Sequence, residues 1–404
     1  MHAMLIILHC ESNTSYAIGT LEQRFFEMAR VLLNDDVSRL HFGYPSMLKG
    51  KPETLPPDFS QYLLIDTCDP SPEAGRAIQR YIEEHRIDVV FGFDQPVHRP
   101  LYRHLRAGGV KHFISYWGAP ISSVFGPIKR LLKKMDVVLH PHGPDHYIFE
   151  SVGMRDTAVL GRGIAAARTS VVPLGVDPDR FYPDAGDRDY IYQIFDIPRE
   201  RHIFFYSGHM ETRKGVPVLL RAAVLLKQKL ARHDWQLVLL GDQPGDAERL
   251  LASVPSAAVR DHITFGGYRN DLHLLHRGCY AGIIASTGWD SLTASAIEMQ
   301  ASGLPLLLSD LPGLREAIEN HSTGTLFPAG DAHALAAAMV SLMDNPAQRN
   351  AMSTLAAHRI KTGFTADIQV NNLVAVLRQV CGPDSAYAPS IAPQETGIWN
   401  QPRP

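Results

Sequence analysis

The chain has 404 residues, of which 45% are hydrophobic and 20% are charged, and its formal net charge is −3 at pH 7. This is the composition of an ordinary globular protein that is long enough for two or three domains. A charge so close to neutral supplies no broad basic surface, so a nucleic acid is not favoured as a partner. The four cysteines form no CxxC pair, which argues against a zinc knuckle or a disulfide framework.

The start of the chain, MHAMLIILHCES, contains only a short apolar run without a basic leader or a small-residue cleavage site. No window of the sequence approaches 18 apolar residues. We therefore expect a cytoplasmic protein whose contact with a membrane is at most peripheral.

Short apolar runs rich in branched residues alternate with segments of helical period, a pattern typical of parallel sheets built from strand–helix units. Two of the expected helices are LEQRFFEMARVLL (21–33) and PEAGRAIQRYIEEH (72–85). In the first half of the chain, strands are predicted at 5–9, 38–44, 62–66, 88–93, 112–118, 136–142 and 170–175. In the second half they are predicted at 202–208, 235–242, 262–267, 280–286 and 304–310. Two such series indicate an α/β protein with two doubly wound, Rossmann-like parallel-sheet domains.

The domain limits follow from changes in composition. Proline, glycine and aspartate cluster at 175–190 and apolar periodicity lapses there, so the first domain is predicted at 1–180 and a linker at 181–198. The second domain is predicted at 199–362, followed by a helix at 363–381 that packs back toward the first domain. The proline-rich, aperiodic end of the chain, 382–404, is expected to be a flexible tail.

In open parallel sheets, ligands bind beyond the carboxyl ends of the strands. The segment GHMETRKG follows the strand predicted at 202–208 and brings Gly208, Arg213 and Lys214 to that edge. Two cations beside glycines suit a diphosphate. An RKG triplet by itself is more often a solvated basic turn, so this interpretation depends on the neighbouring motifs.

A second candidate site is GWDSLTASAIEMQASGLP (288–305), in which Ser291 or Thr293 can cap a helix whose N-terminus attracts an anion. The backbones of Asp290 and Glu298 should lie roughly 10–12 Å apart, at about 1.5 Å per helical residue. That spacing is too long for a proton-sharing pair and fits two contact points along an elongated ligand such as a nucleotide sugar. The alternative is structural: the negative charge of Asp290 would interact favourably with the helix dipole, and Glu298 would be a carboxylate on the helix that forms an ion pair.

Four segments in this order, GHMETRKG, LVLLGD, ITFGGYRNDLHLLHRGCYAGIIAS and DSLTASAIEMQASGLPLLLSDLPGLREAI, resemble the donor-binding half of family 4 retaining glycosyltransferases. The resemblance is specific over about 200–327. It implies the glycosyltransferase B fold, in which two Rossmann-like domains face each other across a cleft. It also implies a nucleotide-sugar donor domain at 199–362, an acceptor-side domain at 1–180, and no metal or other cofactor.

The resemblance assigns roles residue by residue. The family's motif of two glutamates separated by seven residues falls on Asp290 and Glu298, which would contact the donor sugar and the ribose hydroxyls respectively. Lys214 matches the diphosphate lysine. His209 replaces an arginine of the family, a loss for which Arg213 would compensate. The implied donor-binding set is Gly19, Gly208, His209, Gly267, Tyr268, Ser291, Leu292, Thr293 and Glu298, and the catalytic set is Asp290, Lys214 and Arg213.

The acceptor side matches the family less well. Of two glycines that the family often has after the first strand, only Gly19 is kept, and Thr20 follows it. Trp117 stands where the family commonly has a histidine. Its ring would stack on a sugar, with an ordinary core or lid aromatic as the alternative. Trp117 and Asp94 are the acceptor-side candidates.

Two other segments carry weaker signals. Gly143 and Pro144 interrupt HPHGPDH (140–146), and no acidic or cysteine partner has suitable spacing, so no metal site is predicted. The segment GPIKRLLKKMD (126–136) places Lys129, Arg130, Lys133 and Lys134 on one helical side. This is either a solvated face or a contact with an anionic membrane or a phosphorylated acceptor.

The sequence thus predicts a metal-independent retaining glycosyltransferase that moves a sugar from a nucleoside-diphosphate sugar to an acceptor hydroxyl. Lys214, Arg213 and the helix that begins near Leu292 would stabilise the charge on the leaving diphosphate. One alternative is a nucleotide-sugar 2-epimerase. The other is a non-catalytic nucleotide-sugar-binding protein, suggested by the departures at His209, Thr20 and Trp117. The nucleobase, the sugar, the acceptor and the oligomeric state are not specified by these motifs.

Overall fold

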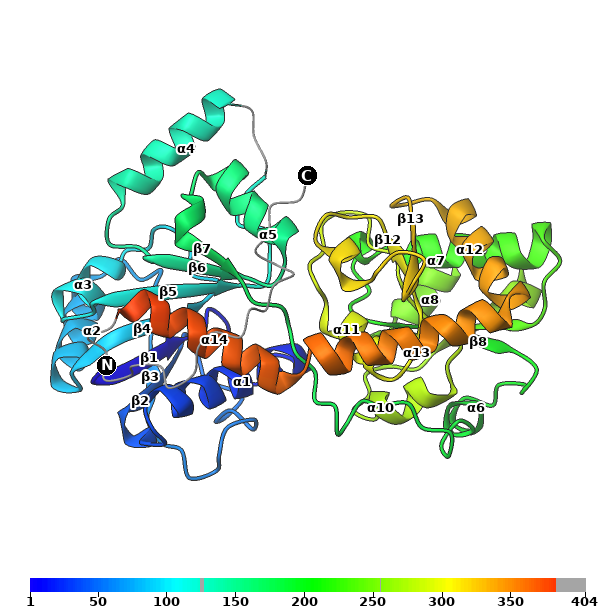
Figure 1. Ribbon diagram of the computed structural model, residues 1–404, viewed down its shortest axis with the longest axis horizontal. Coiled ribbons are helices and arrows are strands. Elements are labelled where there is room, and N and C mark those ends of the chain that lie inside the picture. Colours follow the sequence, from blue (N-terminus) through cyan, green and yellow to red (C-terminus); the bar gives the residue numbers. More distant parts are fainter. Residues whose placement is uncertain (124–126, 255, 383–404) are drawn as a thin grey trace. The chain divides into compact units, whose positions relative to one another are not determined.

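The structure is a computed structural model that describes residues 1–123, 127–254 and 256–382. The chain forms two compact units (Figure 1). Unit 1 comprises Met1–Pro173 and Asp367–Pro404, and unit 2 comprises Leu174–Ala366. Except for Gly382, the tail predicted at 382–404 lies outside the described residues.

The described part of unit 1 contains a seven-stranded parallel sheet with strand order β3-β2-β1-β4-β5-β6-β7. Every residue of β1, β2 and β4 is buried, as expected when helices cover both faces of a parallel sheet. The strands are β1 (Ala3–Ile7), β2 (Leu40–Tyr44), β3 (Tyr62–Leu64), β4 (Ile87–Phe93), β5 (His112–Trp117), β6 (His146–Phe149) and β7 (Thr169–Val171).

Two helices of unit 1, α1 and α2, begin at serine residues that cap them. The Ser15 side chain accepts a hydrogen bond from Ile18 N at the start of α1, and Ser71 does the same for Ala74 N ahead of α2. On the last helix, α14, Gln369 Nε2 donates to the hydroxyl of Tyr116 on β5 (3.4 Å). The helices are α1 (Tyr16–Leu32), α2 (Pro72–Glu84), α3 (Tyr102–Ala107), α4 (Pro127–Leu139), α5 (Val152–Asp156) and α14 (Ala366–Cys381).

The described part of unit 2 contains a six-stranded parallel sheet with strand order β10-β9-β8-β11-β12-β13. The strands are β8 (His202–Ser207), β9 (Trp235–Leu240), β10 (Ile263–Phe265), β11 (Ala281–Ile284), β12 (Leu306–Ser309) and β13 (Gly324–Phe327). The α-helices are α6 (Tyr190–Ile194), α7 (Val216–Val224), α8 (Asp246–Leu251), α9 (Ala257–Arg260), α10 (Leu272–Leu275), α11 (Ala294–Ala301), α12 (Ala332–Asp344) and α13 (Pro346–Gly363). The predicted fold class, two doubly wound parallel-sheet domains, is therefore correct.

The linker lies earlier in the chain than the sequence predicts. The chain passes from unit 1 to unit 2 after Pro173, whereas the predicted linker, 181–198, belongs to unit 2. Phe181 is buried there with its ring 5.7 Å from that of His276, and Arg277 forms an ion pair with Asp184 (3.3 Å). The proline- and glycine-rich composition marks turns in this segment rather than a hinge, because its aromatic and charged side chains anchor it to the domain.

One strand prediction is wrong, and two strands, β6 and β13, were not predicted. The residues 136–142 were expected to form a strand, but Asp136–Leu139 is the last part of helix α4, and the strand that follows is β6. The apolar residues of this stretch continue the 3–4 residue spacing that begins at Ile128, so they complete a helical face. Strand β13, with the sequence GTLF, was not predicted, because a four-residue run that begins with glycine carries little strand signal.

Candidate functional site

Glycines end three neighbouring strands of unit 2 at their carboxyl edge. Gly208 follows β8 and donates from its N–H to Leu240 O (3.0 Å), while Gly241 follows β9 and donates to Gly267 O (2.8 Å). Gly241 has φ +99°, and a Cβ there would lie 2.3 Å from the carbonyl oxygen of Gly208. The edge is therefore lined by backbone that a ligand can approach closely. Gly208 and Gly267 were predicted site residues, whereas Gly241, which connects them, was not.

Lys214 is positioned by the turn after β8. It ends a short 3-10 turn, Thr212–Lys214, and the next residue, Gly215, has φ +76°. A Cβ on Gly215 would lie 1.7 Å from Ala285 O, just beyond the end of β11. The adjacent chain is fixed by a hydrogen bond from Thr287 N to Arg213 O (2.7 Å). Glycine thus allows the turn that carries Lys214 to pack directly on the segment that leads to Asp290.

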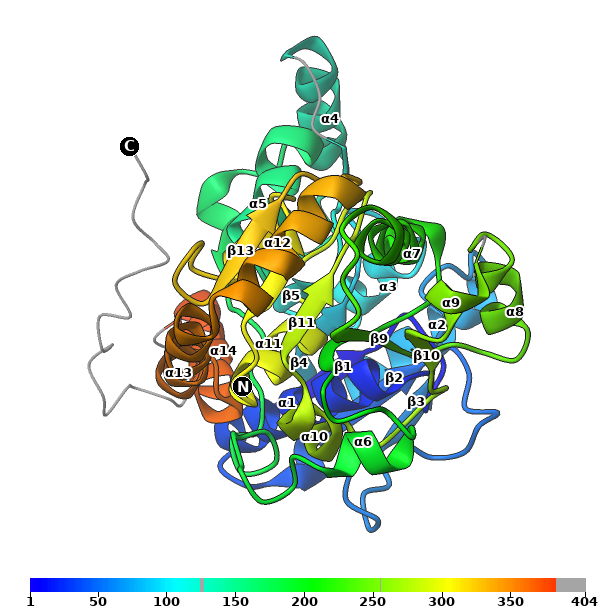
Figure 2. The same cartoon turned by 90° about the vertical axis from the view of Figure 1, so that its right-hand side faces the viewer.

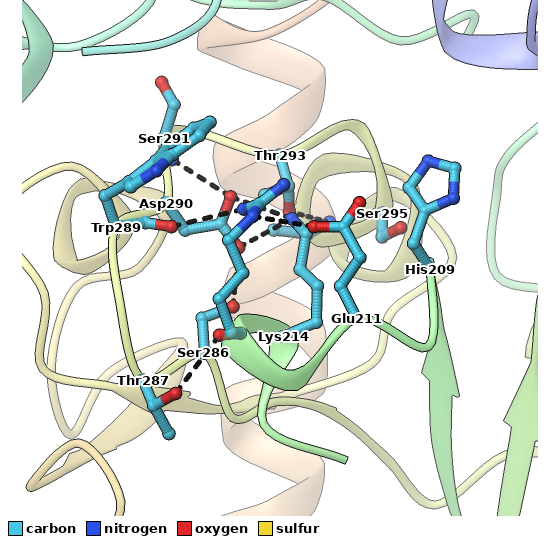
Figure 3. Close-up of polar contacts among 12 residues, drawn as sticks. His209, Glu211, Lys214, Ser286, Thr287, Trp289, Asp290, Ser291, Thr293 and Ser295 are labelled. Atoms are coloured by element: carbon cyan, nitrogen blue, oxygen red, sulfur yellow. Dashed lines mark hydrogen bonds and ion pairs between the residues drawn. The ribbon is translucent and has the colours of Figure 1, made fainter.

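Lys214 and Asp290 form a bidentate ion pair (Figure 3). The Lys214 Nζ atom lies 3.0 Å from Asp290 Oδ1 and 2.8 Å from Oδ2. The hydroxyl of Ser286 donates to Oδ2 (2.6 Å), and the backbone N–H of Ser291 donates to Oδ1 (3.2 Å). The Asp290 side chain is 4% exposed and that of Lys214 is 15% exposed. The carboxylate is therefore a buried anion that a cation and two further donors stabilise, which is the condition under which burial of a charge is tolerated.

Ser286 is a site residue that sequence reasoning missed. It was included in the strand predicted at 280–286, but β11 ends at Ile284. Polar residues directly beyond the carboxyl end of a parallel strand are the residues that face a ligand site. The end of the apolar run at Ala285 was the signal that would have identified Ser286.

Arg213 is held beside the ion pair but has partners of its own. Its guanidinium lies 2.8 Å from Glu211, donates to Trp289 O (3.4 Å) and stacks over the Trp289 ring, 4.2 Å from the centroid. Such a cation–π contact orients a guanidinium. His209 is exposed, and Figure 3 shows it to the side of the cluster without a dashed contact to the other residues drawn. The two residues therefore have different surroundings: Arg213 belongs to the charged cluster, whereas His209 stands apart from it.

Helix α11 begins one residue after Thr293, whose hydroxyl accepts from Ala296 N (3.2 Å). Thr293 is therefore the N-cap, and Ser291, the other capping candidate, is not. The Ser291 side chain is buried, and within the described residues its hydroxyl has no hydrogen-bond partner. The Ser295 hydroxyl donates to Ser207 O (2.9 Å), which fixes the helix start at the end of β8. The positive end of the α11 dipole thus lies at the same sheet edge as the Lys214–Asp290 pair.

The remaining donor-side candidates of unit 2 differ in exposure. Leu292 is 1% exposed and Glu298, in the second turn of α11, is 5% exposed. Tyr268 is 67% exposed next to Gly267, which has φ +67° and open space around its Cβ position. A ligand that approaches this edge from solvent would contact the Tyr268 ring and the Gly267 backbone. Leu292 would contribute only its backbone, because its side chain is buried.

In unit 1, Asp94 and Trp117 lie at the carboxyl ends of the adjacent strands β4 and β5. Asp94 adopts φ +51°, donates from its N–H to Tyr116 O (2.8 Å), and accepts from Gly118 N (3.1 Å). Burial raises the pKa of its carboxyl group to about 7. The Trp117 Nε1 atom donates to Gln95 O (3.3 Å).

His9 is a further polar residue at this edge of unit 1. Its Nδ1 atom lies 3.9 Å from Asp94 Oδ2, and burial lowers its pKa. It was missed because it was counted as the end of the first strand, which stops at Ile7. Gly19 lies inside α1, where a Cβ would come 2.7 Å from the Thr54 side chain, so glycine there permits close packing.

The described residues, 1–123, 127–254 and 256–382, contain no cluster of three or more His, Cys, Asp or Glu side chains that could bind a metal ion. In the histidine-rich segment, the ring of His140 contacts Asp136 O (2.8 Å) and that of His146 contacts the Ser170 hydroxyl (2.8 Å). Nor does the same part of the chain include a helix with the length and apolar character needed to cross a membrane.

Comparison with known proteins gives a family match that lies within unit 2. Residues 187–359 match the family model described as glycosyl transferases group 1. The D-inositol 3-phosphate glycosyltransferase of Salinispora tropica is 29% identical over 52% of this chain and 45% of its own length. The first curated relatives are matched over 45–53% of their own length, about half.

One relative aligns over more of the chain. The GDP-mannose-dependent alpha-(1-6)-phosphatidylinositol monomannoside mannosyltransferase of Mycobacterium tuberculosis is 26% identical over 78% of this chain and 82% of its own length. Among solved structures, a glycosyltransferase from Rickettsia africae superimposes with a TM-score of 0.76 at 16% identity, covering 94% of this chain and 99% of that one. At that identity the superposition shows the fold, which is the glycosyltransferase B fold.

Proposed function

We propose that this chain is a glycosyltransferase that uses a nucleoside-diphosphate sugar, because residues 187–359 match the family model described as glycosyl transferases group 1. In the proposed reaction, the bond between the anomeric carbon and the diphosphate oxygen breaks. An acceptor hydroxyl oxygen bonds to that carbon on the same face, and its proton passes to the leaving phosphate. Retention of configuration is inferred from the family resemblance. The chain's own residues supply binding and charge stabilisation without a metal.

The observation that supports this function best is the Lys214–Asp290 pair beside the N-terminus of α11. The leaving diphosphate gains negative charge in the transition state, and preorganised positive groups at that point lower the barrier. Two of the three N–H donors of Lys214 point at Asp290, which leaves the third for a phosphate oxygen. The first N–H groups of α11 have no partners within the helix and add a second set of donors.

We assign Asp290 a positioning role rather than direct contact with the donor sugar. Both of its carboxylate oxygens already accept hydrogen bonds from Lys214, Ser286 or Ser291, and the side chain is 4% exposed. Glu298 retains the role that the resemblance gives it, as the ligand of the ribose hydroxyls. Arg213, whose charge Glu211 offsets, contributes to the diphosphate side through its position over Trp289.

A thermal-shift screen identifies the donor. A nucleoside diphosphate that binds only the folded protein raises the melting temperature by mass action. We expect one of UDP, GDP or ADP to raise it, and the Lys214→Ala variant to lose that shift. Lys229→Ala, which removes an exposed lysine from the same domain, is the matched control and should behave like the wild type.

Turnover then separates transfer from the alternatives. The identified donor is incubated alone and with a panel of hydroxyl acceptors, which includes an inositol phosphate and a phosphatidylinositol mannoside because the names of the two relatives contain these groups. Product that forms only with an acceptor supports transfer, whereas an epimer formed from donor alone would assign an epimerase. We place this reaction in the cytoplasm, which accords with four cysteines that are all unpaired.

A further inference from the structure

Lys227 lies between two histidine rings at the amino edge of the sheet of unit 2. Its Nζ atom is 2.6 Å from His233 Nδ1 and 2.7 Å from His262 Nε2. The cluster is built beside β9 and β10, two neighbouring strands that Figure 2 labels: Trp235 is the first residue of β9, and His262 directly precedes β10. In a parallel sheet this is the edge opposite the one that carries Lys214, so the cluster is separate from the proposed donor site.

The backbone that carries Lys227 departs from an ordinary α-helix. Helix α7 is followed by a π-helical segment, Leu225–Lys229, before the chain turns toward β9. Such segments are rare and are frequently found at functional sites. Lys227 is at the centre of this one, and its side chain is partly exposed between the buried ring of His262 and the exposed ring of His233. Its amino group is therefore accessible to a reagent from solvent.

The second ring nitrogen of His262 determines which form of the imidazole faces the lysine. His262 Nδ1 lies 2.7 Å from the carbonyl oxygen of Trp235, which can only accept a hydrogen bond, so Nδ1 carries the proton. Burial lowers the pKa of His262, so its ring is neutral at pH 7 and Nε2 presents a lone pair to Lys227. An imidazole oriented in this way is placed to take a proton from the group it faces.

The charges around Lys227 favour its neutral amine. Burial and the Arg201 guanidinium lower the pKa of Lys227, and the opposing effect of Asp261 is smaller. Arg201 is held at the same edge by hydrogen bonds to Gln236 Oε1 (2.8 Å) and Asp261 O (3.0 Å). A lysine is nucleophilic when it is neutral, and desolvation beside another cation is one way in which proteins activate it. With two N–H groups directed at the histidine rings, the lone pair of the neutral amine takes the remaining direction.

We propose that Lys227 is an activated site of covalent modification, whose amino group accepts an acyl group from an acyl phosphate. The neutral amine attacks the acyl carbon: the N–C bond forms, the bond between that carbon and the phosphate oxygen breaks, and phosphate leaves with the electron pair. One of the two protons on the nitrogen passes to His262 Nε2, and the other stays hydrogen-bonded to His233. The Arg201 guanidinium offers a charge that attracts the phosphate group of the reagent. The proposal is independent of glycosyl transfer, because neither donor nor acceptor takes part.

Acetylation of the full chain by acetyl phosphate near neutral pH tests the proposal, with peptide mass spectrometry measuring the acetylated fraction of each lysine over time. Lys229, two residues further on and exposed to solvent, is the internal reference. We expect Lys227 to react about tenfold faster than Lys229, because each unit by which a lysine pKa falls gives about ten times more neutral amine. A lysine that only donates hydrogen bonds to the two rings would stay protonated and react more slowly than Lys229.

Histidine variants test whether the two rings are the activating groups. His233→Gln and His262→Gln should each slow acetylation of Lys227 to about the rate of Lys229, while Lys229 itself is unaffected. His333→Gln, which removes an exposed histidine elsewhere in unit 2, is the matched control and should keep the wild-type rate at Lys227. If the buried His262→Gln variant has a lowered melting temperature, the exposed His233→Gln variant decides the test alone. The proposal is overturned if Lys227 reacts no faster than Lys229 in the wild type, if His233→Gln leaves its rate unchanged, or if His333→Gln slows it equally.

Discussion

The carboxyl edges of the two sheets surround an aspartate side chain in opposite ways. In unit 2, Asp290 is paired with Lys214 and accepts two further hydrogen bonds. In unit 1, Asp94 accepts one backbone N–H, the ring of His9 stays 3.9 Å away, and burial raises its pKa to about 7. The comparison teaches that the edge of unit 2 stabilises the charged form of its aspartate, whereas the aspartate at the edge of unit 1 changes its protonation near neutral pH.

The largest effect should come from breaking the charged pair of unit 2. Replacing Lys214 with Met leaves the Asp290 carboxylate buried without a cation, which should cost about 3–5 kcal/mol of unfolding free energy. The double variant Lys214→Met/Asp290→Asn should recover much of that loss, because the buried charge is removed as well. Chemical denaturation of the two single variants and the double variant measures the coupling. If the losses of unfolding free energy in the two single variants simply add in the double variant, the two side chains are independent.

The turn that brings Lys214 to Asp290 should be nearly as sensitive. Gly215→Ala places a Cβ 1.7 Å from Ala285 O at φ +76° and should cost about 2–4 kcal/mol, with loss of any nucleotide-dependent thermal shift. Gly245→Ala is the matched control, because Gly245 has φ +88° but no atom within 4 Å of its Cβ position. It should cost only about 1 kcal/mol, the cost of the backbone conformation alone. Equal losses would show that the close approach to Ala285 is unimportant.

The protonation of Asp94 should give unit 1 its own pH dependence. A carboxyl group whose pKa is raised on folding binds its proton more tightly in the folded state. Its contribution to stability is therefore complete near pH 4 and is lost as the pH rises to about 7. Asn mimics the protonated form, so Asp94→Asn should be more stable than the wild type by about 1–3 kcal/mol at pH 8 and equally stable near pH 4. Denaturation at both pH values tests this, with the exposed Asp58→Asn as control. A constant difference between wild type and Asp94→Asn would assign Asp94 an ordinary pKa.

The strands and turns at the two sheet edges could be predicted from the sequence, whereas the contacts between their side chains could not. Apolar runs followed by glycines gave the parallel sheets and the positions of Gly208 and Gly267, because strand period and turn chemistry are local. That Lys214 contacts Asp290 could not be read from the sequence, since the two residues are 76 positions apart and are brought together only by the order of β8 and β11. The protonation of Asp94 depends on burial by distant segments. The α4 region was partly assigned to a strand because Val137 and Val138 favour β structure locally, although the helical spacing of their neighbours decides the outcome.

The smallest effects should distinguish the two hydroxyl groups before α11. The Thr293 hydroxyl caps the helix, so Thr293→Ala should lower the unfolding free energy by about 1 kcal/mol and weaken nucleotide binding at the helix N-terminus.

The Ser291 hydroxyl is buried without a partner among the described residues, so Ser291→Ala removes a polar group that makes no hydrogen bond there. In the ligand-free protein that variant should be neutral or slightly stabilising. If the Ser291 hydroxyl donates to a donor phosphate, the same variant will weaken nucleotide binding while leaving the ligand-free melting temperature unchanged or raised. Measuring the melting temperature of both variants with and without nucleoside diphosphate thus separates a hydroxyl that stabilises the ligand-free protein from one that contacts only the ligand. Equal behaviour of the two variants would mean that both hydroxyls are structural.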